Sequence, residues 1–290
     1  MYKLRDWIDI DKLDLCRLTL NINAIDLLEK NLDKIDYDSL SLNENALHIL
    51  NKNRDKINWY NLSLNPGAIH LLEKNINNIF WPNLSLNPNA INLLEKNPNK
   101  INWDCLSTNR NAIHLLEKNP DKINWYNLSE NPGAIHILEK NLDKIDWHSI
   151  LENSNAINIL EKNLEKVDWY YLSSNPSAIH ILEKHLDKVN WYYLSFNPNA
   201  IHILEKNIDK IKWNNFSNNP NGIHLLEKNV DKIEWFYFSG NPSIFELDYE
   251  ALKRRCSVYK EELMKVALHP NRIKKYLEEG MEIEDLENYI

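Results

Sequence analysis

Residues 59–80 read WYNLSLNPGAIHLLEKNINNIF, and residues 125–146 repeat them closely as WYNLSENPGAIHILEKNLDKID. A tryptophan opens both stretches, and the same residue returns every 22 positions through most of the chain. A fixed period of this length is typical of a protein built by stacking one small structural unit. The series comprises Trp59, Trp81, Trp103, Trp125, Trp147, Trp169, Trp191, Trp213 and Trp235.

The register extends beyond the tryptophans in both directions. Leu15 and Tyr37 stand at the tryptophan position of two earlier units, so ten full units run from Leu15 to Glu234. A partial unit, WFYFSGNPSIF, begins at Trp235, and Lys12-Leu13-Asp14 has the form of the end of a preceding unit. No insertion breaks the period, so the whole stretch is expected to form one continuous stack.

Each unit is expected to hold two short helices. Asn65 is a good N-cap for the first, and Pro66 follows at a position where the missing amide proton costs nothing. Ile69 and Leu72 then form an apolar stripe at helical spacing, and Asn75 closes the helix. The Asn-Pro pair recurs at Asn97-Pro98, where it is expected to open a second, shorter helix that leads into the next tryptophan. The pattern predicts an all-α fold, an α-solenoid of two-helix 22-residue repeats with helical end caps.

A leucine-rich-repeat-like solenoid is the alternative fold. Leu62-Ser63-Leu64-Asn65 resembles part of that motif, and the period lies within its range. The remainder of the unit agrees poorly. Asp104 stands where the motif needs an apolar strand residue, and Pro82 would remove a hydrogen-bond donor from the strand. The α-solenoid is therefore favoured.

The ends of the chain depart from the repeat. Residues 1–14 are expected to form an N-terminal cap, residues 15–243 the repeat solenoid, and residues 244–290 a C-terminal helical cap. Within the last segment, Tyr249–Leu268 and Pro270–Glu279 have the pattern of amphipathic helices, the second stopped at Gly280. A basic cluster around Lys253, Arg254 and Arg255 leaves open the alternative that this segment is a separate docking element.

Composition limits the classes of function. The chain has 290 residues and a formal net charge of -8, which disfavours general binding to nucleic acid or to an anionic membrane. No apolar run is long enough to cross a bilayer, and the N-terminus lacks the apolar segment of a signal peptide. Cys16, Cys105 and Cys256 are few and scattered, as expected in a reducing compartment. We therefore expect a protein that is neither secreted nor transmembrane.

No pattern in the sequence predicts catalysis, a cofactor or a metal site. Ser63 and its equivalents recur too regularly to be a nucleophile, and no phosphate-binding loop or zinc motif occurs. Histidine occupies one column in seven of the ten full units, and Asp26, Asn92 and Asn158 fill the same column in the other three. Side chains on stacked helices also do not converge on one ion, so a polar ladder between units is expected instead. The histidines are His48, His70, His114, His136, His180, His202 and His224.

The informative variation lies in the two positions after each tryptophan and in the one after each serine. Residues that vary on a regular scaffold usually face outward, where solenoid proteins bind their partners. Aromatic side chains occupy these positions in neighbouring units, and such residues are enriched at protein interfaces. The predicted partner-binding residues are Tyr170, Tyr171, Tyr192, Tyr193, Phe196, Phe236 and Tyr237.

Two strings carry a resemblance to a known family. The repeat string WYNLSLNPGAIHLLEKN and the tail ELMKVALHPNRIKKYLEEG resemble uncharacterised 22-residue-repeat proteins of mimivirus-type giant DNA viruses. The resemblance implies a viral protein located in the host cytoplasm or in the virion, and it carries no activity. The expected function is a non-enzymatic scaffold that binds another protein. The alternative is a reader of single-stranded RNA, one base per repeat, with Asn61 or Asn127 bonded to a base edge.

Overall fold

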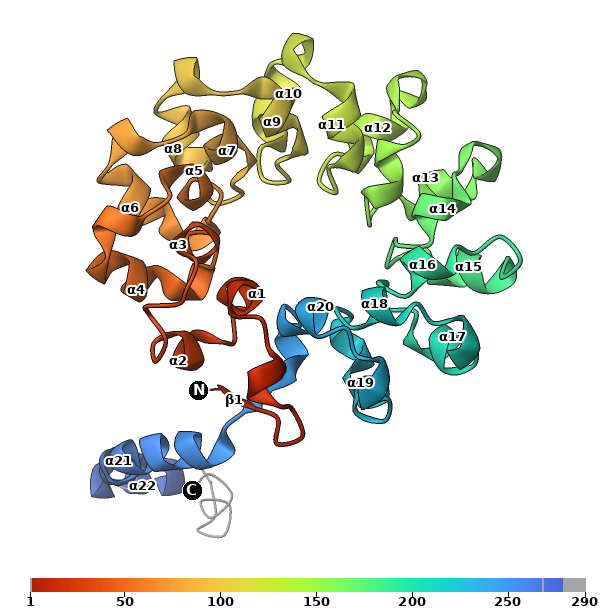
Figure 1. Cartoon of the computed structure of the whole chain (residues 1–290). Coiled ribbons are helices and arrows are strands. Elements are labelled where there is room, and N and C mark those ends of the chain that lie inside the picture. Colours follow the sequence, from red (N-terminus) through yellow and green to blue (C-terminus); the bar gives the residue numbers. More distant parts are fainter. Residues whose placement is uncertain (1, 268, 279–290) are drawn as a thin grey trace. The chain divides into compact units, whose positions relative to one another are not determined.

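The computed structural model describes residues 2–267 and 269–278. It divides into a repeat unit, Arg5–Phe245, and a smaller end unit formed by residues on either side of it. Short helices recur through the repeat unit at the period of the sequence, which confirms the predicted all-α solenoid (Figure 1). Among the described residues the strands are β1 (Tyr2–Leu4) and β2 (Phe245–Leu247), so the leucine-rich-repeat alternative, which needs a strand in every unit, is wrong.

All but one of the repeats begin with a short helix whose first residue is the tryptophan or its substitute, and in the repeat of Trp147 the helix begins at Ser149. An aspartate or asparagine just before the first residue caps most of these helices. The side chain of Asn102, for example, accepts a hydrogen bond from the amide of Cys105. We refer to this set as the inner helices, because they lie on the inner side of the repeat unit (Figure 1). They are α1 (Leu15–Leu20), α3 (Tyr37–Leu40), α5 (Trp59–Leu62), α7 (Trp81–Leu86), α9 (Trp103–Thr108), α11 (Trp125–Glu130), the 3-10 helix η9 (Ser149–Glu152), α14 (Trp169–Leu172), α16 (Trp191–Leu194), α18 (Trp213–Phe216) and α20 (Trp235–Ser239).

A second helix follows on the outer side of each full repeat. The sequence predicted that it begins at Pro66, but in that repeat a 3-10 turn, η4 (Pro66–Ala68), precedes the α-helix. Asn65 caps this turn by accepting a hydrogen bond from the amide of Gly67. These outer helices are α2 (Ile25–Leu28), α4 (Leu47–Lys52), α6 (Ile69–Glu73), α8 (Ile91–Glu95), α10 (Ile113–Lys118), α12 (Ile135–Glu139), α13 (Ile157–Glu161), α15 (Ile179–Lys184), α17 (Ile201–Glu205) and α19 (Ile223–Glu227). Turns like η4 are η2 (Glu44–Ala46), η12 (Pro220–Gly222) and η14 (Pro242–Ile244).

The segment that leads to the next tryptophan is a 3-10 turn and not the start of a longer helix. Asn97 was a candidate to open that helix, but its Nδ2 instead donates to the carbonyl oxygen of Leu93 (2.9 Å) and closes the outer helix. The chain then becomes extended at Ile101 before the next inner helix begins. The turns are η1 (Ile10–Lys12), η3 (Arg54–Lys56), η5 (Ile76–Asn78), η6 (Pro98–Lys100), η7 (Pro120–Lys122), η8 (Leu142–Lys144), η10 (Leu164–Lys166), η11 (Ile208–Lys210) and η13 (Val230–Lys232).

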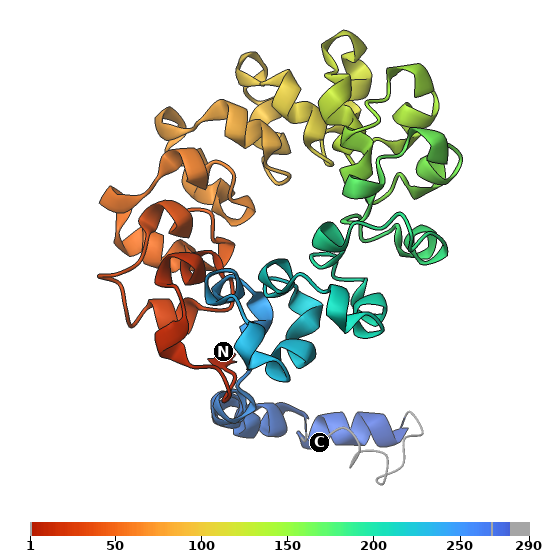
Figure 2. The ribbon, with the colours of Figure 1, turned by 45° about the vertical axis from the view of Figure 1, so that its right-hand side comes forward.

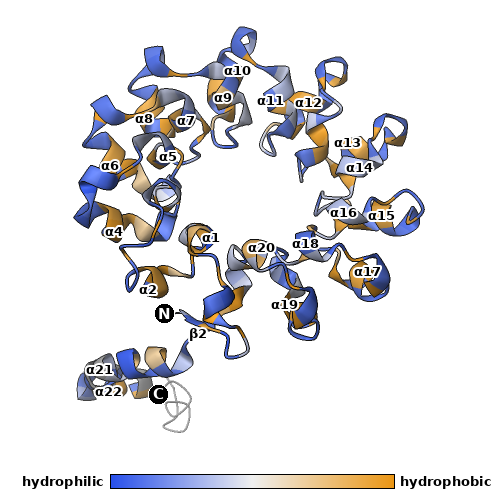
Figure 3. Ribbon diagram, in the orientation of Figure 1, coloured by the Kyte–Doolittle hydropathy of each residue, from blue (hydrophilic) through white to orange (hydrophobic). Residues whose placement is uncertain are grey.

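Leucines between the inner and outer helices form a continuous core. Leu62 of α5 and Leu72 of α6 are fully buried, and the equivalent residues of other repeats are buried in the same way. In Figure 3 the hydrophobic colour lies mainly on the helices, whereas the outermost turns are hydrophilic. The tryptophans are only half-buried at the junctions between repeats. Burial of about 25 cal/mol per Å² of apolar surface makes this leucine layer the main stabilising element of the stack.

One buried asparagine per repeat joins successive repeats. Asn109 caps its own turn by accepting from the amide of Asn111 (3.0 Å). Its Nδ2 also donates to the carbonyl oxygens of Ser85 (3.0 Å) and Asn87 (2.9 Å) in the preceding repeat. The sequence predicted the cap but not the second role. Because each of these polar groups is buried, the asparagine satisfies carbonyls that would otherwise lack a partner.

The first and last repeats contact each other through the same pair of hydrogen bonds. The Nδ2 of Asn21 donates to the carbonyl oxygens of Asn241 (2.9 Å) and Ser239 (3.4 Å), as that of Asn43 does to Asn21 (3.2 Å) and Thr19 (2.9 Å). Asn43 lies 22 and 24 residues after its two acceptors. Asn21 lies 220 and 218 residues before its acceptors, and these separations become 22 and 24 if eleven periods of 22 residues form a closed circle. Figures 1 and 2 show α1 beside α20 from two directions. The repeat unit therefore closes into a ring of eleven repeats.

The eleventh repeat is assembled from two separate segments. Trp235–Phe245 supplies its inner half, and residues 5–14 supply most of its outer half. At the junction with the first repeat, the amide of Asp14 donates to Ser239 Oγ (2.8 Å), the bond that a serine accepts from a residue 17 positions later elsewhere in the ring. Residues 5–14, expected from the sequence to belong to an N-terminal cap, thus complete a repeat.

Side chains of the two segments also interlock. The ring of Trp7 packs on Phe238 with centroids 5.8 Å apart, and Lys12 Nζ lies over the ring of Trp235 at 5.1 Å. Lysines occupy the same place over the tryptophans of other repeats, as Lys122 does over Trp103 at 4.5 Å. The two segments of the eleventh repeat are therefore held together by a contact of the kind that occurs within each of the other repeats.

The end unit contains both strands and two longer helices. The strands β1 and β2 pair with each other, and Lys3 Nζ forms an ion pair with Glu246 Oε1 (3.2 Å). The helices are α21 (Tyr249–Ala267) and α22 (Pro270–Glu278), which confirms the two predicted helices within the described residues. Leu268, Glu279 and Gly280 lie outside those residues.

Candidate functional site

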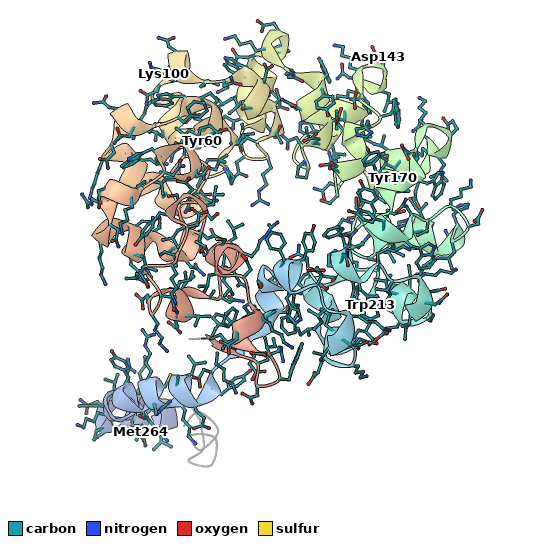
Figure 4. The ribbon with its side chains drawn as sticks, viewed as in Figure 1. Tyr60, Lys100, Asp143, Tyr170, Trp213 and Met264 are labelled. Carbon is teal, nitrogen blue, oxygen red and sulfur yellow. The ribbon has the colours of Figure 1, made fainter. Side chains whose placement is uncertain are left out.

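The variable positions lie on the inner helices. Figure 4 places Tyr60 and Tyr170 on the inner side of the repeat unit, whereas Lys100 and Asp143 lie on its outer side. Helical geometry explains the direction of the side chains. In α14 the residues three and four positions after the tryptophan, Leu172 and Ser173, are fully buried, so the position directly after the tryptophan points away from the core.

Five of the predicted residues form one aromatic cluster, which we define as Tyr170, Tyr171, Tyr192, Tyr193 and Phe196. Tyr170 contacts Tyr193 of the next repeat at 4.4 Å between ring centroids, and Tyr192 contacts Tyr193 at 5.3 Å. Phe196 extends the cluster at 6.4 Å from Tyr192, and most of these pairs are edge-to-face. The cluster is exposed in part, with 43% of Tyr170 and 50% of Tyr192 accessible. Two neighbouring repeats thus present one aromatic surface.

Tyr193 lies at the centre of the cluster, in ring contact with Tyr170, Tyr171 and Tyr192. A hydrogen bond between the hydroxyls of Tyr193 and Tyr170, helped by desolvation, raises the pKa of Tyr193 to about 12. The hydroxyl of Tyr193 therefore remains protonated in neutral solution. The surface combines uncharged aromatic faces with hydroxyl groups, a composition common at protein interfaces.

The other two predicted residues belong to a separate group. Phe236 and Tyr237 contact each other at 5.4 Å, next to the junction that closes the ring. Arg17 from the first repeat places its guanidinium carbon 4.3 Å from the ring centroid of Phe236 and 5.9 Å from that of Tyr237. The structure therefore does not bring all seven predicted residues together. Phe236 and Tyr237 lie in a different repeat from the aromatic cluster, and they contact an arginine of the same chain.

An acidic group borders the aromatic cluster, and sequence reasoning missed it. His148 packs edge-to-face on Tyr171 at 4.3 Å. Desolvation and the nearby carboxylates of Glu152 and Asp146 raise the pKa of Glu130, and His148 opposes this effect. The signal was present in the sequence, because glutamate follows the serine position in two successive repeats only here. We define Glu130, Asp146 and Glu152 as the acidic group.

Asparagines at the second variable position are already engaged. The Nδ2 of Asn61 donates to the carbonyl oxygen of Asp38 (2.9 Å), and that of Asn127 donates to Asp104 (2.8 Å). Asn83 and Asn215 make the same bond to their preceding repeats. These amides link repeats, so their donor groups are not directed at a ligand.

The histidine column forms the polar ladder that the sequence predicted. His114 Nε2 lies 3.0 Å from Glu95 Oε1 in the preceding repeat, and His202 Nε2 lies 2.7 Å from Glu183 Oε1. Four further pairs repeat this contact, at His48, His136, His180 and His224. Within residues 2–267 and 269–278, no three histidine, cysteine or acidic side chains are arranged to hold a metal ion.

The serine column also has structural partners. Ser107 Oγ donates to the carbonyl oxygen of Trp103 (2.8 Å) and accepts from the amide of Asn124 (3.0 Å). A nucleophile would need a base as its partner instead. Of the cysteines, Cys16 and Cys256 are exposed, and burial raises the pKa of the half-buried Cys105 thiol.

Comparisons with known proteins add no relative. No protein-family model, curated protein or solved structure matches the chain. In the part of the chain that the structure describes, no helix has the length and apolar character needed to cross a membrane.

Proposed function

We propose that the repeat unit is a non-enzymatic protein–protein interaction scaffold and that the aromatic cluster is its main contact surface. The observation that carries the proposal is the partly exposed aromatic surface made by Tyr170, Tyr192 and their neighbours on two adjacent repeats. Rigid aromatic side chains supply a large contact area at a low entropic cost. A closed ring holds this surface on a backbone that need not reorganise when a partner binds.

The resemblance to giant-virus repeat proteins supports a further part of the proposal. A viral scaffold of this kind would meet its partner, a viral or host protein, in the host cytoplasm or in the virion. The RNA-reading alternative has weaker support. The amides of Asn61 and Asn127 already donate to carbonyl oxygens, and the negative net charge of -8 opposes binding to a phosphate backbone.

A pair of double variants tests the scaffold proposal. The double variant Tyr170→Asn with Tyr192→Asn removes two exposed aromatic side chains from the cluster. The fold tolerates asparagine directly after the tryptophan, because Asn214 occupies that position in another repeat. Tyr60→Asn with Tyr126→Asn is the matched control, because both tyrosines occupy the same position in other repeats and are 53% exposed.

The measurement is cross-linking mass spectrometry of each variant in cells that contain the natural partners. We expect the first variant to lose cross-linked proteins that the wild type and the control retain. If both variants keep the same proteins as the wild type, the cluster is not the contact surface.

A further inference from the structure

Within the repeat ring, two aromatic residues at the positions directly after a tryptophan already bind a cationic side chain of the same chain. Phe236 and Tyr237 occupy the first and second positions after a tryptophan, and they hold the guanidinium of Arg17 from the next repeat. The carbon of that guanidinium lies 4.3 Å from the Phe236 centroid, well within the range of a cation–π contact. An aromatic pair at these two positions therefore binds an arginine side chain from the neighbouring inner helix.

Tyr192 and Tyr193 form the same pair in another repeat, but they lack the arginine. The residue equivalent to Arg17 is Asn215, which is 4% exposed and donates to the carbonyl oxygen of Tyr192 (2.8 Å). No lysine or arginine among the described residues lies over either tyrosine ring. Tyr192 remains 50% exposed, so its ring is accessible to a cation from another molecule.

The acidic group gives this surface a matching charge. Glu130 is half-buried, and desolvation together with the charges of Glu152 and Asp146 raises its pKa. Asp146 in turn accepts a hydrogen bond from the amide of His148 (3.1 Å). Within the described residues, no lysine or arginine forms an ion pair with Glu130 or Glu152. His148 joins the group to the cluster through its contact with Tyr171. The result is a continuous strip of carboxylates followed by aromatic rings, which favours cations and repels phosphates.

We propose that the aromatic cluster and the acidic group together bind an arginine-containing basic segment of a partner protein. One guanidinium stacks on Tyr192 and Tyr193, as Arg17 does on its own aromatic pair, and further basic side chains pair with Glu130 and Glu152. Arginine is preferred over lysine because its planar guanidinium stacks on aromatic faces and is more weakly hydrated. This inference rests on the proposed scaffold function and adds the chemical class of the partner.

Short labelled peptides provide the test. An Arg-Ser repeat peptide and a Lys-Ser repeat peptide of equal length and charge are titrated with the full chain, and fluorescence anisotropy reports binding. We expect the arginine peptide to bind about fivefold more tightly than the lysine peptide, because the planar guanidinium stacks on the rings and is more weakly hydrated than an ammonium group.

Three variants separate stacking from general electrostatics. Tyr192→Asn weakens the arginine peptide several-fold and removes its advantage over the lysine peptide. The control Tyr60→Asn, at the same position of a repeat away from the acidic group, leaves both affinities unchanged. Glu130→Gln with Glu152→Gln weakens both peptides, and the effect diminishes as salt is added, because the contribution is Coulombic.

Three outcomes overturn the inference. Equal binding of the two peptides, with no response to Tyr192→Asn, would mean that only the net charge of the protein attracts them. Binding of a single-stranded RNA oligonucleotide that Tyr192→Asn abolishes would assign the surface to nucleic acid. If neither peptide binds, but the Tyr170→Asn, Tyr192→Asn variant still loses cross-linked proteins that its control retains, the proposed scaffold function stands and only the arginine preference is refuted.

Discussion

At the scale of single residues, the repeat depends on polar side chains that each do several tasks. The buried asparagine of every repeat caps a turn and donates to the preceding repeat, as the three bonds of Asn109 show. The serine before it links its own helix to the next repeat in a similar way. Because these groups are buried, replacing one leaves a carbonyl or amide without a partner at a cost of about 1–3 kcal/mol. This explains why the two columns hardly vary within the chain.

The apolar core makes a simple prediction at this scale. Leu138 is fully buried, so Leu138→Ala should lower the free energy of unfolding by about 2–5 kcal/mol through lost burial and a residual cavity. Leu142 lies four residues later and is 47% exposed, and Leu142→Ala should change stability by less than about 0.5 kcal/mol. Urea denaturation followed by circular dichroism compares the two, and similar losses would contradict the position of the core.

The acidic group predicts a dependence of stability on pH. The pKa of Glu130 is raised in the folded state, so the folded chain binds the proton more strongly than the unfolded chain does. The ionised carboxylate therefore destabilises the fold, fully so above the raised pKa, and the penalty disappears once the group is protonated in both states. Glu130→Gln should raise the melting temperature at neutral pH and have no effect below the ordinary pKa of a glutamate. Thermal melts of both proteins across that range decide the question, and a gain that persists in acid would point to packing instead.

At the scale of elements, the sequence predicts repeated helices well and their boundaries less well. Asn65 and Leu72 predicted a capped apolar helix, and the structure contains both the cap and the buried stripe. The 3-10 turns were missed, since a short turn has no apolar period of its own. Asn97 was misread because asparagine is favoured both before and after a helix, and only its bond to Leu93 separates the two roles.

The candidate site was predicted in part for a related reason. Within-chain variation located the aromatic positions, because the scaffold residues around them do not vary. It could not show that Arg17 covers Phe236, since these residues lie at opposite ends of the repeat region in sequence. It also missed Glu130, whose role depends on carboxylates in two other segments of the chain.

Closure of the ring predicts that a terminal repeat behaves as an interior one. Asn21 and Asn109 make the same bonds, Asn21 to the last repeat and Asn109 to its predecessor. Asn21→Ala and Asn109→Ala should therefore destabilise the protein to a similar extent, about 1–3 kcal/mol each. In an open stack the amide of Asn21 would face solvent, and its replacement would cost only the cap. Equilibrium unfolding of both variants distinguishes the two cases, and a much smaller loss at Asn21 would contradict closure.

At the scale of the repeat unit, closure removes the problem that terminal repeats pose in an open solenoid. An open stack leaves two apolar faces that need polar caps. Here residues 5–14 and Trp235–Phe245 combine into one repeat, so each face of every repeat contacts a neighbour. The two halves were both visible in the sequence, as Lys12-Leu13-Asp14 and as the partial unit WFYFSGNPSIF. Their union could not be predicted, because it depends on whether the curvature of eleven repeats closes a full turn.

A circular permutant tests that closure directly. The amide of Arg5 donates to the carbonyl oxygen of Ile244 (3.1 Å), so a few glycines suffice to join Phe245 to Arg5. New termini are placed between Pro120 and Asp121, in an exposed turn of the outer side. Because the joined ends are already neighbours, the permutant should fold to the same helix content and the same compact dimensions as an unpermuted chain of residues 5–245.

The unpermuted chain of residues 5–245 is the matched control, since it has the same composition without the new connection. Circular dichroism and small-angle X-ray scattering measure both proteins. In an open solenoid, the short linker would force distant ends together, and the permutant would lose helix content or form domain-swapped oligomers while the control stayed folded. A folded monomeric permutant would mean that the ring forms wherever the chain begins and ends, because each repeat is stabilised by its two neighbours alone.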